Sequence, residues 1–326
     1  MRNSEPDVLV IGAGVAGLTT AVCLARAGQR VLVQAAESPQ LTTSAVAGAI
    51  WGLHLVGMDG RVAGWAAQTL ASLRDLASVP AAGVRITRGL DAYRTPQPGP
   101  PPWTDGVGDR ESCPAAELPD GYAAGWRFAA PVVAMPVYLD YLLELLVRAG
   151  GRLEVRRDFA SLRAAAGQCA AAVIVNCAGI GARDLVPDPA VLPVRGQVIV
   201  LANPGLTDFF IGHDGDSGGV AYLFPHGDTV VAGGTQTAGD WSREPDPVTA
   251  ARILAACTAA EPRLRGAAVL THRVGLRPVR PAVRLDTEDI GGGRLVVHNY
   301  GHGGAGVSLS WGCALEVTRQ VTGQCG

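Results

Sequence analysis

The chain has 326 residues, enough for one large domain or two interleaved ones, and 48% of them are apolar. All 27 basic residues are arginine, which excludes a lysine Schiff base and the lysine of a Walker phosphate-binding loop. A formal net charge of −2 argues for neither a nucleic-acid nor a membrane-surface partner.

Cysteine usage indicates a reducing compartment. The 7 cysteines are odd in number, scattered along the chain and never spaced as C-x-x-C, so we expect neither a disulfide framework nor a metal site. The uncharged stretch 8–25 follows Glu5 and Asp7 and carries glycines at motif spacing. We therefore expect this stretch to be part of the fold instead of a signal peptide, and the protein to be cytoplasmic.

The first predicted elements are a strand, a glycine turn, a helix and a second strand over residues 7–37. VLVI is an unbroken apolar run, as expected of a parallel strand covered on both faces. The turn fits G-x-G-x-x-G. Its first glycine permits the turn, its second lets a pyrophosphate approach the helix N-terminus, and its third lets helix and strand pack closely. The motif comprises Gly12, Ala13, Gly14, Val15, Ala16 and Gly17. Glu37, the first acid after the second strand, is either a ribose ligand or a solvated side chain.

Later segments alternate between helical and strand-rich patterns. Helices are predicted at 61–78, at 137–150, after Asp246 and at 307–321, and 95–120 is expected to lack regular structure. An antiparallel strand pair is predicted to turn at 226–228. This order indicates an α/β fold with a Rossmann-like dinucleotide-binding domain and an interleaved α+β domain that contains an antiparallel sheet. The predicted domains are 1–52, 137–197 and 270–326 for the first, and 53–136 and 198–269 for the second.

A glycine cluster precedes the last helix, in NYGHGGAGVSLSWGCALE at 299–316. Such a cluster costs conformational entropy, so either it forms a tight turn or its backbone must meet something closely. Together with the glycine turn at residue 12, it favours FAD over NAD. A second backbone turn before a helix can hold a flat isoalloxazine ring and stabilise its negative charge. We expect His302, within the cluster, to be structural.

Five segments in this order resemble the D-amino acid oxidases, FAD-dependent amine oxidases that are grouped with the D-aspartate oxidases. They are LTTSAVAGAIW, VNCAGIGARDLVPDPAVLPVRGQ, AYLFP, GLRPVRP and NYGHGGAGVSLSWGCALE. The resemblance covers nearly the whole chain and is weakest over 80–135. It implies a glutathione-reductase-like FAD domain joined to a substrate domain. It also implies oxidation of D-amino acids by O2, which yields 2-oxo acids, ammonia and hydrogen peroxide.

The resemblance assigns FAD to three segments besides the first glycine turn. Thr42, Thr43 and Ser44 match a hydroxyl-rich FAD-binding stretch. A second set would line the flavin through its backbone: Gly48, Ala49 and Ile50. The late cluster would wrap the far edge of the ring through Gly303, Gly304, Ala305, Gly306, Val307 and Ser308.

Substrate binding is implied for three further positions. Arg277 in GLRPVRP matches an arginine that pairs with the substrate carboxylate, and Tyr222 in AYLFP matches a tyrosine that hydrogen-bonds the same group. A guanidinium can hold a carboxylate in two parallel bonds, which fixes its orientation. The carbonyl of Gly304 would accept a hydrogen bond from the substrate amine. The Cα hydrogen could then pass as hydride to flavin N5 without a side-chain base.

Departures from the family pattern concern side-chain preference. Gly218 stands where some members carry a second tyrosine on a lid loop. His54 and His213 lie roughly where the D-aspartate branch uses a histidine and an arginine, so they are either specificity residues or loop residues without a role. Since a dicarboxylate favours a permanent cation, we expect neutral D-amino acids as substrates, with D-aspartate as the alternative.

Two other functions stay open at this point. A glycine or sarcosine oxidase would share the fold and would be recognised by activity on a secondary amine. A non-catalytic FAD-binding module would keep the flavin, but no amino acid would bleach it. The sequence does not distinguish a monomer from a homodimer.

Overall fold

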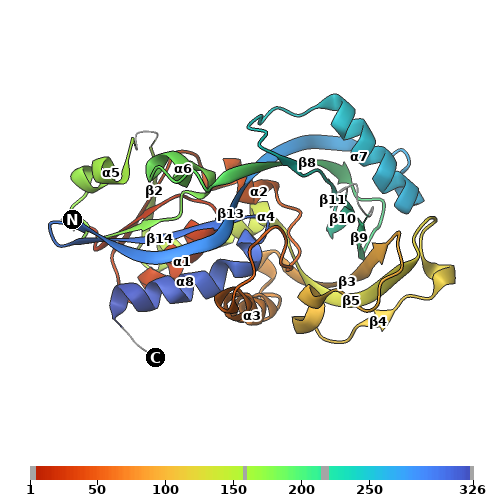
Figure 1. The fold of residues 1–326 in the computed structure, drawn as a ribbon, viewed down its shortest axis with the longest axis horizontal. Helices are drawn as coiled ribbons and strands as arrows, with labels where there is room; N and C mark the ends of the chain where they lie inside the picture. The colour runs from red at the N-terminus through yellow and green to blue at the C-terminus, as the bar shows by residue number, and fades with distance from the viewer. Residues whose placement is uncertain (1–4, 157–159, 214–219, 324–326) are drawn as a thin grey trace.

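One mixed sheet runs through the computed structural model, which describes residues 5–156, 160–213 and 220–323 (Figure 1). A fourteenth strand, β12 (Thr237–Ala238), pairs with β8 beside the main path. The other strands follow one another in the order β4 (Glu111–Ser112), β5 (Ala124–Val133), β3 (Val84–Tyr93), β9 (Phe209–His213), β10 (Val220–His226), β11 (Thr229–Gly233), β8 (Leu192–Ala202), β13 (Val269–Gly291), β14 (Arg294–His302), β7 (Val173–Asn176), β1 (Val8–Ile11), β2 (Val31–Ala35) and β6 (Arg152–Val155).

One half of the sheet is parallel: β6, β2, β1, β7 and β14 all run in the same direction. Alternate residues of β1 point to opposite faces, and all four are buried because helices cover both sides. One face packs against α1 (Val15–Arg26), α4 (Met135–Arg148) and α8 (Gly306–Thr322), and α3 (Gly60–Leu76) lies against α8. The other face packs against α5 (Leu162–Gln168) and α6 (Ala182–Leu185).

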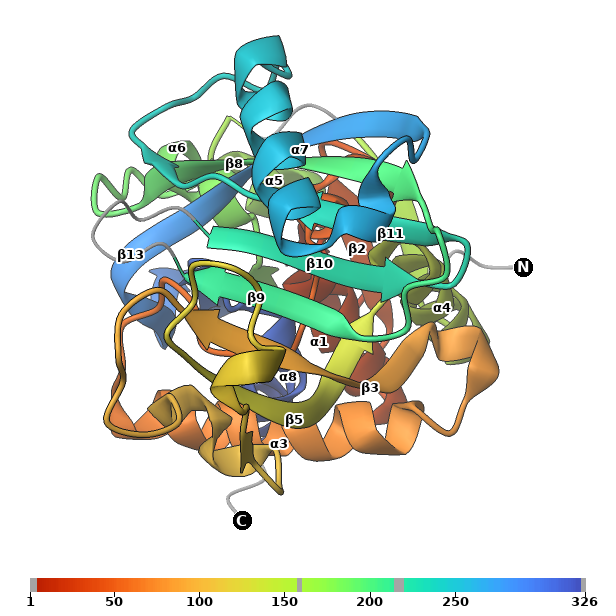
Figure 2. The same ribbon diagram turned by 90° about the vertical axis from the view of Figure 1, so that its right-hand side faces the viewer.

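The other half of the sheet is mostly antiparallel. Strands β13, β8, β11, β10 and β9 pair antiparallel in turn, and β9 then pairs parallel with β3. Figure 2 shows α7 (Pro247–Ala260) lying across this half. Ile253 and Cys257 of α7 are buried in a core with Leu201 and Leu223. Asp246 caps the helix by accepting from the backbone N–H groups of Val248 and Thr249, which confirms the predicted start.

The predicted helices are present, whereas several strands were not foreseen. Strand β13 continues through Pro278 and Pro281, residues that usually argue against a strand, and β3, β5 and β9 were not predicted. The segment 95–120, for which no regular structure was expected, contains short 3₁₀ turns and β4. A short helix, α2 (Thr43–Val46), follows the first of the hydroxyl residues, Thr42.

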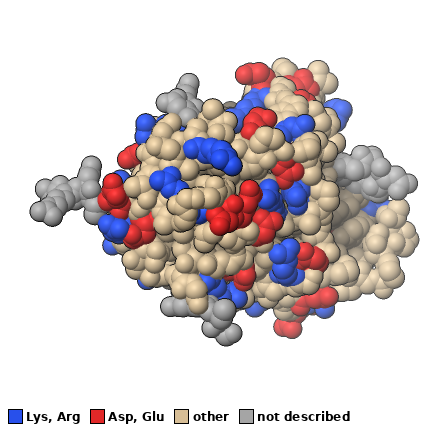
Figure 3. All heavy atoms as spheres, turned by 60° about the vertical axis from the view of Figure 1, so that its left-hand side comes forward, with Lys and Arg blue, Asp and Glu red and all other residues tan. Residues whose placement is uncertain are grey.

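The division into two domains stays a prediction. Two of its predicted boundaries fall within strands, because residue 197 lies inside β8 and residue 270 inside β13. None of the helices in the described ranges is long and apolar enough to cross a membrane. On the face shown in Figure 3, arginines and acidic side chains are interspersed. This distribution agrees with the small net charge.

Candidate functional site

A cavity lies at the carboxyl ends of β1, β2 and β7 and extends to β8, β10 and β13. Ligands of α/β sheets bind at this edge of the strands. The cavity brings together predicted residues from six separate segments of the chain. Those that line it are Gly12, Ala13, Gly14, Val15, Ala16, Glu37, Thr42, Thr43, Ser44, Tyr222, Arg277, Gly303, Gly304, Gly306 and Val307.

The first glycine turn is packed tightly on one side and bare on the other. Gly12 has a φ of +109°, and a Cβ there would lie 2.4 Å from the carbonyl oxygen of Cys177. A Cβ on Gly17 would lie 1.9 Å from the oxygen of Gly12, so helix α1 can approach the turn only with glycine. At Gly14, within the described chain, a Cβ would meet just Ser44 Oγ, at 3.1 Å. An added Cβ at Gly14 would therefore fill the cradle itself.

The N-terminus of α1 presents backbone donors to this cradle. Val15 N–H donates to Ser44 Oγ at 3.0 Å, and the first turn of α1 contains no acidic residue. A helix N-terminus carries partial positive charge, which favours an anion. The turn and helix therefore fit the pyrophosphate of a dinucleotide.

The late glycine cluster is pressed against the loop that contains His54 and Leu55. A Cβ on Gly303, whose φ is +55°, would lie 1.7 Å from the oxygen of Leu55. A Cβ on Gly304 would lie 2.8 Å from His54 Cδ2, and Gly304 N–H donates to the carbonyl of His54 at 3.1 Å. The glycines thus allow this close packing, and the exposed side of their backbone lines the cavity.

Some predicted residues do not line the cavity. Ser308 is buried, and its hydroxyl donates to the carbonyl of Gly52 at 2.7 Å while accepting from the Gly52 N–H. His302 does line the cavity, but its ring is hydrogen-bonded to Asn299 at 3.0 Å, in agreement with the structural role expected for it. The predicted residues outside the lining are Gly17, Gly48, Ala49, Ile50, Ala305, Ser308, His54 and His213.

Arg277 and Tyr222 meet at the end of the cavity formed by the antiparallel strands. Arg277 Nη1 donates to the carbonyl of Thr235 at 2.9 Å, and the guanidinium lies beside the Tyr222 hydroxyl. Burial raises the pKa of Tyr222, which therefore stays protonated at neutral pH. A Cβ on Gly196 would lie 2.3 Å from Arg277 Nη1, so this glycine makes room for the guanidinium. No carboxylate of the described residues forms an ion pair with Arg277.

His213 is held by a buried acid that sequence reasoning did not identify. Its Nε2 lies 2.6 Å from Asp91 Oδ1, the Asp91 side chain is fully buried, and the Tyr93 hydroxyl donates to Asp91 Oδ2 at 3.0 Å. The ring of Tyr93 stacks on His213 with centroids 4.3 Å apart. Strand register puts Asp91 in a row with Ile211 and Tyr222, on the same face of the sheet. The charge of a protonated His213 is therefore matched by Asp91.

His54 stands on the other side of this region, beside Gly304. Although its side chain is exposed, protein atoms around the ring lower the pKa of His54, and the charges of Arg277 and His213 act in the same direction. The ring is therefore neutral near pH 7. Gly218, the position of the lid tyrosine in some relatives, lies outside the described residues.

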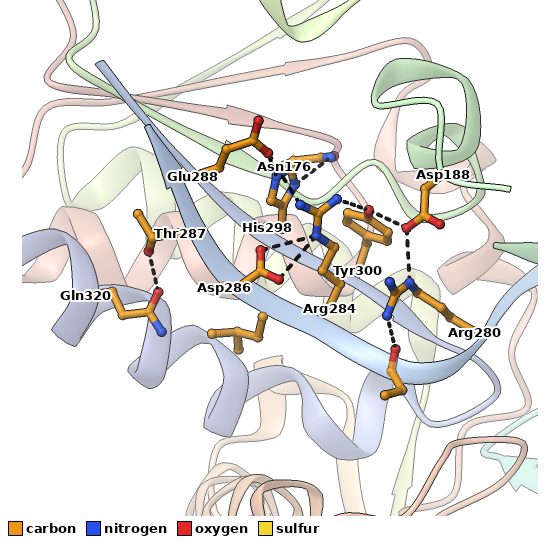
Figure 4. Close-up of polar contacts among 12 residues, drawn as sticks. Asn176, Asp188, Arg280, Arg284, Asp286, Thr287, Glu288, His298, Tyr300 and Gln320 are labelled. Carbon is orange, nitrogen blue, oxygen red and sulfur yellow. Dashed lines mark hydrogen bonds and ion pairs between the residues drawn. The ribbon is translucent and has the colours of Figure 1, made fainter. Parts of the chain in front are cut away.

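A polar network fixes the strands that carry the cavity wall (Figure 4). Arg280 Nε donates to Asp188 Oδ2 at 3.0 Å, and the buried Tyr300 hydroxyl donates to the same oxygen at 2.7 Å. Arg284 Nη1 in turn donates to the Tyr300 hydroxyl at 2.9 Å. Arg280 and Arg284 belong to β13 and Tyr300 to β14, so Asp188 ties both strands to the loop after α6. Arg280, which follows Arg277 by three residues, thus has a structural partner.

Further lining residues were missed. Cys177 to Gly181 follow strand β7, and the rule that ligands lie at the carboxyl ends of parallel strands could have identified them. Arg243 carried no local signal, because it reaches the cavity from a loop between β12 and α7. The missed lining residues are Ala35, Ala36, Val46, Ala47, Cys177, Ala178, Gly179, Ile180, Gly181, Gly196, Val198, Arg243, Gly275, Leu276, Pro278 and His302.

The fold and the site together define an FAD-binding oxidoreductase. The family model described as FAD dependent oxidoreductase matches residues 7–320, and the chain belongs to this family. Its cofactor is therefore FAD. The bare turn at Gly14 and the glycine cluster fit this cofactor.

Comparison with individual proteins gives closer relatives. The chain is 49% identical to a D-amino-acid oxidase of Rubrobacter xylanophilus, over 94% of this chain and 93% of that one. It is 42% identical to a D-amino-acid oxidase of Streptomyces coelicolor, over 97% and 96% of the two chains. Among solved structures, glycine oxidase from Geobacillus kaustophilus superposes with a TM-score of 0.81, covering 98% and 95% of the chains. Its 18% identity shows a shared fold alone.

Proposed function

We propose that this protein oxidises neutral D-amino acids to 2-oxo acids, with release of ammonia and reduction of O2 to hydrogen peroxide. The observation that carries the proposal is the guanidinium of Arg277. It is braced by Thr235 and Tyr222 at one end of the cavity, whose other end is the bare glycine turn. The two D-amino-acid oxidases with 49% and 42% identity support the same reaction, and a non-catalytic module would not need such a guanidinium.

Arg277 would bind the α-carboxylate of the substrate. One of its donors is used by Thr235 and another contact is made with Tyr222, so the remaining N–H groups of the fork can donate to two carboxylate oxygens. Because both partners fix the guanidinium before the substrate arrives, little conformational entropy is lost on binding. Tyr222 would donate its hydroxyl hydrogen to the same carboxylate.

Gly304 would orient the substrate amine through its carbonyl, while the bare backbone of the cluster faces the flavin. When bound, FAD supplies the acceptor for the hydride that leaves Cα. The chain would contribute position instead of a base, because two fixed contacts, at the carboxylate and the amine, determine whether the Cα hydrogen or the side chain faces the acceptor. One hand of the substrate meets both contacts with its side chain directed to open space, which would select the D configuration.

The preference for neutral side chains rests on the two histidines. A second substrate carboxylate would reach beyond the lining residues toward the imidazole of His213, which is already hydrogen-bonded to the buried Asp91, and the ring of His54, which is neutral near pH 7. Neither group offers the permanent cation that a dicarboxylate favours. The same reasoning makes D-aspartate a poorer substrate than D-alanine.

The cofactor residues follow from the cavity lining. We propose that the turn from Gly12 to Gly17 binds the pyrophosphate, Glu37 the ribose, and Thr42, Thr43 and Ser44 the neighbouring part of FAD. The segments Gly48 to Ile50 and Gly303 to Ser308 would enclose the flavin, Ser308 by holding the backbone of Gly52. The parallel half of the sheet would then serve as the FAD domain, and the antiparallel half as the substrate domain.

The six described cysteines are unpaired, and all but Cys169 are buried. Free buried thiols fit a reducing compartment, so we propose that the protein acts in the cytoplasm.

The test is the visible spectrum of the purified protein under anaerobic conditions, before and after addition of D-alanine, L-alanine, D-aspartate or sarcosine in separate cuvettes. We expect a yellow protein that D-alanine bleaches much faster than the others do. Bleaching chiefly by D-aspartate would overturn the neutral preference, and bleaching chiefly by sarcosine would favour a glycine-type oxidase. A yellow protein that no amino acid bleaches would refute the proposed reaction.

A further inference from the structure

The sequence VRGQ in strand β8 contains two buried polar residues that the reaction does not use, Arg195 and Gln197. Arg195 is 5% exposed, and it donates to the carbonyl of Ser242 at 3.1 Å and to that of Glu244 at 2.6 Å. Gln197 is fully buried and exchanges two hydrogen bonds with the backbone of Asp246, at 2.8 and 2.9 Å. Both side chains are thus committed to the backbone of one surface segment, residues 239–246, here called the strap.

The strap crosses to the other half of the molecule. Arg243 at its centre donates through Nη1 to Glu37 Oε1 at 2.6 Å, and the two residues are 206 positions apart in sequence. Glu37 follows β2 in the parallel half, whereas the strap leads from β12 into α7 in the antiparallel half. Both side chains line the cavity. The ion pair therefore spans the cavity at the end where the second strand of a dinucleotide fold meets the ribose.

We propose that the strap is a latch over the adenosine end of FAD, and that Arg243 is a positioning residue for Glu37. A carboxylate can accept hydrogen bonds on both oxygens. With Oε1 held by Arg243, the second oxygen of Glu37 would be left to accept from a ribose hydroxyl. Arg243 also offsets the negative charge of Glu37, which would otherwise repel the nearby pyrophosphate. The hydrogen bonds of Arg195 and Gln197 fix the backbone of the strap in the position from which the Arg243 side chain contacts Glu37.

The expected effect on affinity is moderate, because the pair is partly exposed, with side-chain exposures of 49% and 37%. We expect Arg243→Ala to weaken FAD binding to the apoprotein by about 3- to 10-fold at low salt, and less at high salt. Arg243→Lys keeps the charge and should restore part of the loss. Because ADP shares the ribose and pyrophosphate with FAD but lacks the flavin, its affinity should fall by the same factor.

The experiment measures the dissociation constants of FAD and of ADP with apoprotein by titration calorimetry. It compares wild type, Arg243→Ala, Arg243→Lys, Glu37→Gln and the double variant Arg243→Ala/Glu37→Gln. Arg252→Ala, which removes an exposed arginine of α7, is the matched control and should bind as wild type does. We expect Arg243→Ala to weaken binding in the wild-type background and to have almost no effect in the Glu37→Gln background.

Two results would overturn the latch. Equal losses in both backgrounds would mean that Arg243 does not act through Glu37, and a wild-type affinity in Arg243→Ala would mean that the strap is not part of the FAD site. As a second readout, ADP should slow tryptic cleavage after Arg243 in the wild-type apoprotein, and unchanged cleavage would also contradict the proposal. None of these measurements depends on the substrate, so they stand or fall separately from the proposed reaction.

Discussion

The two halves of the sheet line the cavity with different parts of the chain. The parallel half contributes backbone. The glycines of the turn at Gly12 to Gly17 and of the cluster at Gly303 to Gly306 leave the backbone without side chains where strands and helices meet the cavity. The antiparallel half contributes side chains, chiefly Arg277 and Tyr222, which contacts from neighbouring strands hold in place.

This difference follows from the ligands that we assign to each half. A dinucleotide is long and offers phosphate oxygens that many backbone N–H groups can bind together. An amino acid is small, so its orientation depends on a few charged contacts in fixed positions. If the comparison is correct, a single side-chain change should impair the substrate end selectively, and a single added methyl group should impair the cofactor end.

The largest effect is expected from Arg277→Ala. The variant should keep bound FAD but lose about 10²- to 10³-fold or more in kcat/KM for D-alanine, because the substrate carboxylate loses its cation. Steady-state kinetics together with the flavin spectrum measure both quantities. Arg277→Lys keeps the positive charge but not the two-pronged guanidinium, so its kcat/KM should lie between those of the wild type and Arg277→Ala. A near-normal kcat/KM in Arg277→Ala would refute the assignment.

Next in size is the response of the cofactor end to one methyl group. Gly14→Ala should fold, because its Cβ meets little more than Ser44 Oγ, yet it should weaken FAD binding by roughly 10- to 10²-fold through loss of close backbone approach. Gly12→Ala should instead lower the free energy of unfolding by about 2–4 kcal/mol, from the clash with Cys177 and a left-handed backbone.

Gly28→Ala separates these two causes. Gly28 also has a positive φ, of +86°, but an added Cβ would meet nothing within 4 Å. We expect a loss of about 1 kcal/mol in the free energy of unfolding and unchanged FAD affinity. Equal behaviour of Gly12→Ala and Gly28→Ala in urea unfolding would contradict the packing argument.

The third prediction concerns pH and the buried ring at the border of the two halves. Burial lowers the pKa of His302 to about 4, whereas the unfolded chain has the ordinary value of 6.5. Between these values the unfolded chain binds a proton that the folded protein does not. The free energy of unfolding therefore falls as the pH drops below 6.5, by ~2 kcal/mol at pH 5.

Urea unfolding at pH 7.5 and pH 5 checks this prediction through the change in the free energy of unfolding between the two pH values, not through its absolute value. His302→Asn should reduce the difference between the two pH values by ~2 kcal/mol. His272→Asn, which removes an exposed histidine of β13, is the control. If the free energy of unfolding of His302→Asn changes with pH as much as that of the wild type, this ring does not account for the change.

The smallest expected effect concerns the preference for neutral over acidic substrates. His54→Arg adds a cation without a carboxylate partner, so the ratio of kcat/KM for D-aspartate to that for D-alanine should rise about 3- to 5-fold. In His213→Arg the new cation would meet Asp91, as the imidazole does, and the ratio should hardly change. Equal increases in both variants would show that Asp91 does not neutralise that position.

The sequence predicted the parallel half well, because each of its signals is local. The apolar run of β1 and the glycine spacing of the turn are each visible within a few residues. Strand β13 was missed because Pro278 and Pro281 interrupt the usual strand pattern, although β8 and β14 still pair with it.

Partners that meet across long distances in sequence could not be predicted. Asp91 reaches His213, 122 residues away, through the pairing of two strands that had not been recognised. Arg243 reaches Glu37 only because the strap is held by residues of a third segment. Composition and periodicity contain no record of such pairings, whereas the resemblance to known oxidases identified Arg277 and Tyr222 as motif residues.

The length of β13 limits how the enzyme can move. Of its 23 residues, the first part, up to Val279, pairs with β8, and the part from Arg284 pairs with β14, so the same strand carries Arg277 and joins the two halves of the sheet. Swinging the halves apart would bend β13 between Val279 and Arg284, where its pairing with β14 is irregular, and would break the hydrogen bond of Arg280 to Asp188. We therefore expect substrate and product to exchange through local motion of loops and side chains at the cavity mouth, while the distance between Arg277 and the proposed flavin site stays constant throughout turnover.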